Sequence, residues 1–275
     1  MIRTAVNKTE LAKQLGISRS SLYYQSKRPA IDEEVRRQIE SVLSDHPAYG
    51  HKRIAWALKL NRKRIRRVMK KFGLKPYRRR PKRPDKKADL GKRAAKYSNL
   101  IETLKIDCPG QVWVTDFTYI RFHGRFIYLA TVMDLFTREV VGFNLSRFHN
   151  RFLVMGAALD ALEKHTPPEI IHSDQGSEYD SQDFIDLINS LNISISMSRK
   201  ASPWENGHQE SFFGHLKLEA ADLNRFDTDG ELIEELCRMI YYYNHGRIHS
   251  KLKMPPAEYR QKYQNSSKED IKSMP

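Results

Sequence analysis

The alternation of apolar and polar residues divides the chain into a helical first part and a second part in which strands and helices alternate. Apolar residues recur at helical spacing up to about residue 73, whereas from residue 111 onward β-branched and aromatic residues dominate short runs bounded by turns. The predicted strands cover 112–121, 125–134, 139–146, 169–174 and 193–198, and the predicted helices cover 151–165, 181–191, 204–221 and 231–245. Three successive antiparallel strands followed by alternating helices and strands predict an α+β fold, with a five-stranded mixed sheet flanked by helices.

The first thirty residues have the apolar spacing, turn residue and cap residue typical of two short helices. Leu11, Leu15 and Ile17 are apolar at the spacing of a helix pair, Gly16 supplies the turn, and Ser18 is suited to cap the second helix. This pattern predicts a helix-turn-helix-like DNA-binding segment over 1–30, in which Arg19 lies on the outward side of the second helix.

A second all-helical DNA-binding module is predicted over 31–73. Its last helix is expected to begin after Asn61, a good N-cap residue, and to stop at Gly73. Ile65, Val68 and Met69 form the apolar stripe of that helix. The cations predicted to face outward, toward DNA phosphates, are Arg62, Lys63, Arg66, Arg67 and Lys70.

Positive charge is concentrated in the first hundred residues. They contain 29 Lys and Arg against 8 Asp and Glu, while the rest of the chain contains 19 against 25. Residues 74–100 include three prolines and the run Arg78, Arg79 and Arg80, and lack helical periodicity, which predicts a basic linker. Such a distribution favours a nucleic-acid partner over a merely solvated surface.

Several classes of protein are excluded by composition. No run approaches the roughly 20 apolar residues of a membrane span, and the N-terminus lacks the apolar centre of a secretory signal. Two cysteines, Cys108 and Cys237, cannot form a disulfide framework or a cysteine-based zinc site. We therefore expect a cytoplasmic protein with no membrane partner.

Three acidic residues occupy positions that a sheet can bring together. Asp116 lies in the middle of the first predicted strand, on the face of Val114 and Thr118; Asp174 ends the fourth strand; and Glu210 lies on the helix after the last strand. A carboxylate on an apolar strand face has to be paired, protonated or bound to a cation. Thirty-five residues separate Asp174 from Glu210, a spacing that an Asp and a Glu would show about once by chance, so the structural context carries the prediction.

Long strings of the sequence resemble the integrase-type transposases of the insertion sequence 3 family. They are VWVTDFTYI, IHSDQGSEY, SMSRKASPWENGHQESFFGHLKLE and YYYNHGRIHSKLKMPPAEY, preceded by HPAYGHKRIAWALKLNRKRIRRVMKKFGLK. The resemblance covers most of residues 45–260 and implies a ribonuclease-H-like integrase core, assigned here to 101–262, with a polar tail over 263–275. It also implies that Asp116, Asp174 and Glu210 are the catalytic Asp-Asp-Glu triad, and that Lys217 is the family's DNA-contacting basic residue.

The chemistry of three carboxylates agrees with this assignment. Oxygen ligands without His or Cys favour Mg²⁺, with Mn²⁺ as a substitute, and two such ions can support an in-line displacement at phosphorus. The resemblance implies cleavage and joining of double-stranded DNA at the inverted repeats of an insertion element and at a target, by a bacterial, nucleoid-associated protein that is at least a dimer when two ends are paired. Two alternatives stay open: a DNA-binding regulator with an inactive core, and a structure-specific nuclease that cuts without joining.

Other polar residues near these motifs have simpler interpretations. His172 is expected to be a structural hydrogen bonder rather than a ligand, and His245 with His249 has the spacing of a zinc pair but no evident third ligand. Trp204 and Asn206 fit either core packing and capping or DNA contact. The residues predicted to lie in the core are Tyr241, Tyr242 and Tyr243, and those predicted at the surface or in turns are Asp134, Glu139 and Glu178.

Overall fold

A computed structural model describes residues 8–23, 27–77, 96–198, 207–220 and 222–272. The chain divides into two compact units, residues 1–77 and 78–275, and each is described by itself. None of the helices described is long and apolar enough to cross a membrane.

The N-terminal unit begins with a pair of short helical elements, the second of which is a 3-10 helix. Helix α1 spans Lys8–Gln14, Gly16 makes the turn at φ +63°, and the second element is a five-residue 3-10 helix, η1, Arg19–Tyr23. The Ser18 hydroxyl accepts from the Ser21 amide, as expected of a cap. Leu15 and Ile17, predicted to be packed, are exposed because so short a pair offers little surface to bury them.

Three helices form the second module of this unit: α2 at Arg28–Asp45, α3 at His51–Ala57 and α4 at Arg62–Lys71. The core of the module contains Ile39, Ile54, Ile65 and Val68, all without exposed surface. The predicted caps of α4 are confirmed, since the Asn61 side chain accepts from the Lys63 amide at 2.8 Å and Gly73 adopts φ +68° just beyond the helix. The module ends later than predicted, because the Tyr77 amide donates to the Pro47 carbonyl.

One of the cations predicted to face DNA is used inside this module. Arg67 donates to both carboxylate oxygens of buried Asp32, at 2.7 and 2.6 Å, and Lys71 donates to the same carboxylate at 2.9 Å. These hydrogen bonds hold the pKa of Asp32 well below its usual range. The bidentate pair joins α2 to α4, so Arg67 helps to pack the module, although its side chain is 51% exposed and faces outward as predicted.

The C-terminal unit contains the predicted five-stranded mixed sheet, in the order β3-β2-β1-β4-β5. Strands β1 (Val112–Phe122), β2 (Arg125–Asp134) and β3 (Val140–Ser146) are antiparallel, and β4 (Ile170–Ser173) and β5 (Ser194–Met197) run parallel to β1. The helices are α5 (Arg151–Lys164), α6 (Gln182–Ser190), α7 (Gly207–Glu219), α8 (Asp229–His245) and α9 (Pro256–Lys272), with a 3-10 turn η3 at Leu223–Arg225.

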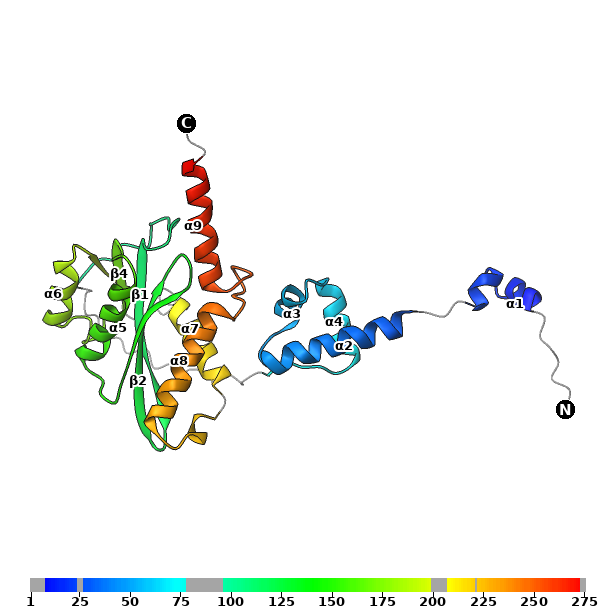
Figure 1. Ribbon diagram of the computed structural model, residues 1–275, viewed down its shortest axis with the longest axis horizontal. Helices are drawn as coiled ribbons and strands as arrows, with labels where there is room; N and C mark the ends of the chain where they lie inside the picture. Colours follow the sequence, from blue (N-terminus) through cyan, green and yellow to red (C-terminus); the bar gives the residue numbers. More distant parts are fainter. Residues whose placement is uncertain (1–7, 24–26, 78–95, 199–206, 221, 273–275) are drawn as a thin grey trace. The chain divides into compact units, whose positions relative to one another are not determined.

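Two hydrophobic layers sandwich the sheet (Figure 1). On one face Val112, Val114 and Ile120 of β1 pack with α7 and α8, and on the other face Trp113 packs with α5 and α6. The alternation along β1 thus assigns Asp116 to the α7 side, as the sequence predicted. This is a ribonuclease-H-like α+β core.

The limits of the core differ from those predicted. Residues 96–100, predicted as linker, already pack on it: Lys96 pairs with Asp180, and the Leu100 amide donates to Ser196 Oγ at 2.9 Å. At the other end, α9 continues to Lys272 through the range predicted as a polar tail. Helix α9 leads away from the sheet (Figure 1). Tyr259 and Tyr263, on its first turns, pack against Phe136.

Candidate active site

Asp116 and Asp174 meet because β1 and β4 are adjacent and parallel. Val114 is the register partner of His172, so two residues further along each strand the chain reaches Asp116 and Asp174. The pairing recorded between these strands covers Val112–Val114, and Asp116 lies just beyond it. Glu210 lies in the first turn of α7, the helix that packs on the same face of β1.

The electrostatics show that the carboxylates influence one another. Burial raises the pKa of Asp116 to about 7, and the charges of Asp174 and, less strongly, Glu210 add to this, although the Phe117 amide, donating to the Asp116 carboxylate at 2.8 Å, opposes it. Burial also raises the pKa of Asp174, against the hydrogen bond that it accepts from Gly176 at 3.0 Å. Negative charge is therefore crowded here, and a cation would relieve it.

The donor set suits a hard divalent cation. Asp116, Asp174 and Glu210 offer carboxylate oxygens alone, the ligands that Mg²⁺ and Mn²⁺ prefer. As they stand, no three His, Cys, Asp or Glu side chains in the described ranges form a ready metal-binding cluster, and the Glu210 side chain is exposed. The donor chemistry fits the ion, with Asp116 half-buried on β1, Asp174 half-buried just after β4 and Glu210 exposed on α7.

Gln209, which the sequence analysis did not single out, fixes the first turn of α7 to the sheet. It has no exposed surface, its amide donates to the Val114 carbonyl at 2.8 Å and toward the Thr131 carbonyl at 3.3 Å, and it accepts from Thr131 Oγ1 at 3.0 Å. Thr131 is the cross-strand partner of Asp116. One buried amide thus links the residue before Glu210 to both strands around Asp116.

We expect Gln209→Met to lower the single-turnover rate of DNA joining by about 10–100-fold, the usual cost of losing a residue that orients catalytic ligands. Methionine keeps the volume but makes none of the three hydrogen bonds, so Glu210 loses its register with Asp116. The dissociation constant for DNA should not change. Ser211→Ala, an exposed change in the same turn, is the matched control. A normal rate in Gln209→Met at a normal melting temperature would show that the amide is not needed for positioning.

Lys217 lies two helical turns after Glu210 and reaches the same strand. Its ammonium donates to Thr118 Oγ1 at 2.6 Å and lies 4.7 Å from the centre of the exposed Tyr119 ring. Thr118 is two residues from Asp116, on the same face of β1. The helix therefore presents Glu210 and Lys217 along one edge of the strand.

The remaining predicted DNA contacts lie in different places. Arg19, Arg62, Lys63 and Arg66 are exposed in the N-terminal unit. Arg78, Arg79 and Arg80, like Trp204 and Asn206, lie outside the described residues.

Two histidine interpretations can be compared with the structure. His172 is fully buried, its Nδ1 lies 2.9 Å from Ser196 Oγ, and burial lowers its pKa to about 4, which agrees with a structural role. His245 and His249 belong to no three-residue metal cluster within the described ranges, and the His245 ring packs on Tyr241.

Some surface and core predictions were wrong. Tyr241 is exposed, because three consecutive residues of a helix cannot all face one layer, while Tyr243 is buried. Asp134, Glu139 and Glu178 lie in or beside turns, as one of the two alternatives predicted, but they are buried. Asp134 accepts from the Thr137 and Gly110 amides, and Glu139 pairs with Arg260 at 3.0 Å.

Glu178 is a further acid beside the aspartates. A methyl group placed on Gly176 would lie 3.0 Å from Asp174 Oδ1 and 3.1 Å from Glu178 Oε2, so these two carboxylates are at most about 6 Å apart. Glu178 Oε1 pairs with His149 Nε2 at 3.0 Å. Its position in IHSDQGSEY was visible in the sequence, but its partner, 29 residues upstream, was not.

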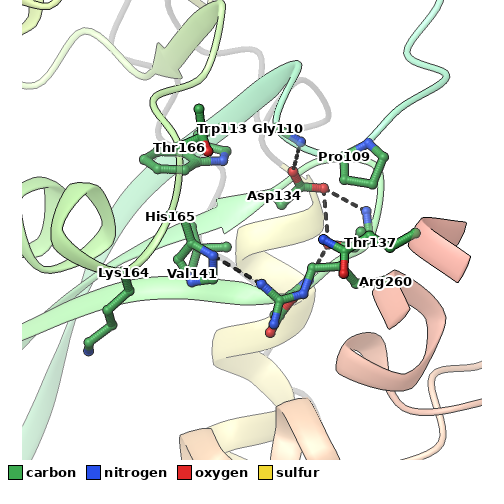
Figure 2. Close-up of a pocket in the computed structure, with 12 residues that line it drawn as sticks. Pro109, Gly110, Trp113, Asp134, Thr137, Val141, Lys164, His165, Thr166 and Arg260 are labelled. Carbon is green, nitrogen blue, oxygen red and sulfur yellow. Dashed lines mark hydrogen bonds and ion pairs between the residues drawn. The ribbon is translucent and has the colours of Figure 1, made fainter. Parts of the chain in front are cut away.

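A separate cavity of 280 Å³ opens where α9 meets the sheet (Figure 2). Arg260 of α9 points toward His165 at the end of α5, with 3.0 Å between Nη1 and Nδ1. Asp134, which accepts from the Gly110 amide, also lines the cavity. Trp113, at the start of β1, also lines it. The cavity does not include any of the three catalytic candidates.

Comparison with known proteins supports the interpretation of the fold. Residues 107–203 and 191–256 match two integrase core domain families. The InsK protein of insertion sequence element IS150 from Escherichia coli (strain K12) is 32% identical over 263 residues, covering 91% of this chain and 92% of that protein. The transposase of insertion sequence element IS904 from Lactococcus lactis is 32% identical over 240 residues, covering 82% and 93%.

Among solved structures, the simian T-cell lymphotropic virus intasome in complex with PP2A regulatory subunit B56 gamma superposes with a TM-score of 0.52, at 16% identity, over 81% of this chain and 74% of that chain. At this identity the likeness concerns the fold. The fold and the integrase-core match define a polynucleotidyl transferase. The chain belongs to the integrase-core family of insertion-sequence transposases.

Proposed function

We propose that this DNA transposase binds the terminal inverted repeats of an insertion element and cuts and joins DNA at a site made of Asp116, Asp174 and Glu210. The observation that carries the proposal is the placement of the three carboxylates on adjacent elements of an integrase core: Asp116 on β1, Asp174 after the parallel strand β4, and Glu210 on the helix packed against β1. Family membership supports action on DNA, and integrase cores generally depend on divalent metal ions.

The three carboxylates would hold two Mg²⁺ ions, or Mn²⁺ in their place. When bound, such ions lower the pKa of an attacking hydroxyl and stabilise the leaving oxygen at phosphorus. The chain's own residues hold the reacting groups in register: Gln209 fixes α7 against β1, and Lys217 offers a cation to a phosphate beside Thr118. Water attacks in the cutting step and a DNA 3′-hydroxyl attacks in the joining step, so no covalent enzyme intermediate and no ATP are required.

DNA recognition would come mainly from the basic first third of the chain. Arg19, Arg62, Lys63 and Arg66 are exposed there and suited to phosphate contact, whereas Arg67 is held by Asp32. Pairing of two element ends requires at least a dimer, and the nucleoid is the expected location of a protein that acts on bacterial DNA.

The test is incubation of the full chain with labelled element-end DNA. We expect nicked and joined products with Mg²⁺ or Mn²⁺, none in EDTA, and no restoration by Zn²⁺ alone, because the ligands are all carboxylate oxygens. Nicks without joined products, when a free 3′-hydroxyl end is supplied, would indicate a nuclease. DNA binding without either product would indicate a regulator, and equal activity in EDTA would contradict the carboxylate site.

A further inference from the structure

A group of aromatic rings, the aromatic face, lies on the side of β1 and β2 opposite α7. Phe117, Tyr119, Phe126 and Tyr128 share this side, since Tyr119 is the cross-strand partner of Tyr128 and Phe126 that of Arg121. Tyr119 and Phe126 meet edge to face at 5.2 Å between ring centres. His149, from the β3–α5 loop, stacks on Tyr128 at 5.2 Å and packs on Phe117 at 4.5 Å, and it completes the aromatic face.

Helix α5 covers the part of this side of the sheet around Ala130 and Val132, and it leaves the part around Tyr119 and Phe126 exposed. Ala130 and Val132 are buried among its side chains, whereas Tyr119 is 58% and Phe126 47% exposed. Phe148, next to His149, is 70% exposed. Large rings exposed together at a fixed place are uncommon on proteins unless they meet a partner.

The loop that carries Phe148 is held in place. Arg147 pairs with Asp229, His149 with Glu178 at 3.0 Å, and Arg151 with Asp183 at 2.5 Å. These ion pairs use Arg147 and His149 of the loop and Arg151 at the start of α5, whereas Phe148 between them is 70% exposed. The ring is thus presented at little cost in conformational entropy when a partner binds.

The aromatic face approaches the catalytic carboxylates through His149. His149 contacts Glu178, which lies within about 6 Å of Asp174, whereas Phe117 follows Asp116 in the strand and points to the other side of the sheet. At the opposite margin the Lys217 ammonium lies 4.7 Å from the Tyr119 ring centre. Rings flanked by a cation at a phosphodiester-cutting site form the combination that binds unpaired nucleic acid, with bases stacked on the rings and phosphate on the cation.

We propose that the aromatic face stacks unpaired bases of the DNA strand at the catalytic site. This inference rests on the proposed function, because DNA reaches these rings by occupying the carboxylate site. Tyr119, Phe126 and Phe148 would each offer a flat surface that accepts any base, so the face would favour DNA that is unpaired near the phosphate to be cut and would be indifferent to the identity of those bases.

The test measures binding by the full chain, in EDTA, to two DNAs of equal length and sequence, one fully paired and one with three unpaired nucleotides at the cleavage position. We expect the wild type to prefer the unpaired DNA by at least about fivefold, the effect of one stacked base. Tyr119→Ala, Phe126→Ala and Phe148→Ala should each reduce that ratio, while Tyr119→Phe keeps it. Tyr241→Ala removes an equally exposed ring on α8 and is the matched control.

A second measurement locates the bases directly. With 5-iodouracil at the unpaired positions, photocrosslinks should fall on Tyr119, Phe126 or Phe148. Crosslinks elsewhere, or alanine variants that keep the full preference, would overturn the inference. So would variants that change the sedimentation of the free protein but not the preference, since the face would then join two copies of the chain. The binding assay needs neither metal nor cleavage. The base-stacking inference can therefore be refuted while the carboxylate assignment stands, and the carboxylate assignment can be refuted while the base-stacking inference stands.

Discussion

Glu210→Gln should reduce both cutting and joining of element-end DNA by more than about 100-fold, while the dissociation constant for that DNA stays near the wild-type value. Losing even a residue that merely orients a metal ligand costs 10–100-fold, and Gln removes a ligand charge outright. The side chain is exposed on the first turn of α7, so the change of charge with conserved shape leaves the helix and its buried anchor, Gln209, undisturbed.

The measurement is a time course of nicked and joined products with Mg²⁺, beside fluorescence anisotropy with the same DNA. Asp116→Asn and Asp174→Asn should behave like Glu210→Gln. Glu163→Gln, the same chemical change at an exposed position of α5, should leave both readouts unchanged. Near-normal joining by Glu210→Gln would refute the assignment of the triad, whereas loss of binding together with activity would indicate that Glu210 serves DNA recognition instead.

The parts of the structure that follow from local pattern were predictable. The two-residue period of β1 assigned Asp116 to the buried face, and the cap at Asn61 marked the start of α4. The parallel pairing of β1 with β4 could be expected from the alternation of elements, and it is this pairing that brings Asp116 beside Asp174. Short-range chemistry and strand order were enough for these features.

Features that depend on contacts far apart in the sequence were not predictable. Gln209 reads as an ordinary polar helix residue until the sheet brings Val114 and Thr131 against it. Arg67 has the pattern of an outward cation, yet both of its terminal nitrogens donate to a buried acid on another helix, Asp32. A helix pattern shows which face a residue occupies but not which partner stands opposite, so paired cations and anchoring amides are recognised from the fold.

The exposure of the aromatic face also could not be predicted from the strand sequence. Aromatic residues at alternate positions of a strand predict a face that is buried under another element. Around Ala130 and Val132 helix α5 does bury this face. Helix α5 begins only at Arg151, held by the Asn150 cap at the end of a loop tied to Glu178, and the rings of Tyr119 and Phe126 are left exposed. Where the cover ends depends on where the loop is anchored, which the strand sequence does not encode.

The close approach of β3 to α5 gives the last prediction: Gly142→Ala should lower the free energy of unfolding of the C-terminal unit by about 1–3 kcal/mol, the usual cost of overpacking a filled core. A methyl group at Gly142 would lie 2.5 Å from the Ala157 carbonyl oxygen and the Ala161 amide nitrogen, and 2.6 Å from Ala161 Cβ. Two of these neighbours are helix backbone, so α5 as a whole would have to move away from the sheet.

The measurement is urea unfolding of the full chain, followed at a signal from the C-terminal unit, because the two units need not unfold together. Gly214→Ala is the matched control of opposite sign: nothing lies within 4 Å of its added methyl group, and alanine inside a helix is favoured over glycine by about 1 kcal/mol. Adding Ala161→Gly to Gly142→Ala removes the Cβ clash but leaves both backbone clashes and places a glycine inside α5, so it should not restore stability. An unchanged urea midpoint for Gly142→Ala would contradict the close packing of β3 against α5 at Gly142. The β3–α5 loop would then not be fixed by that packing.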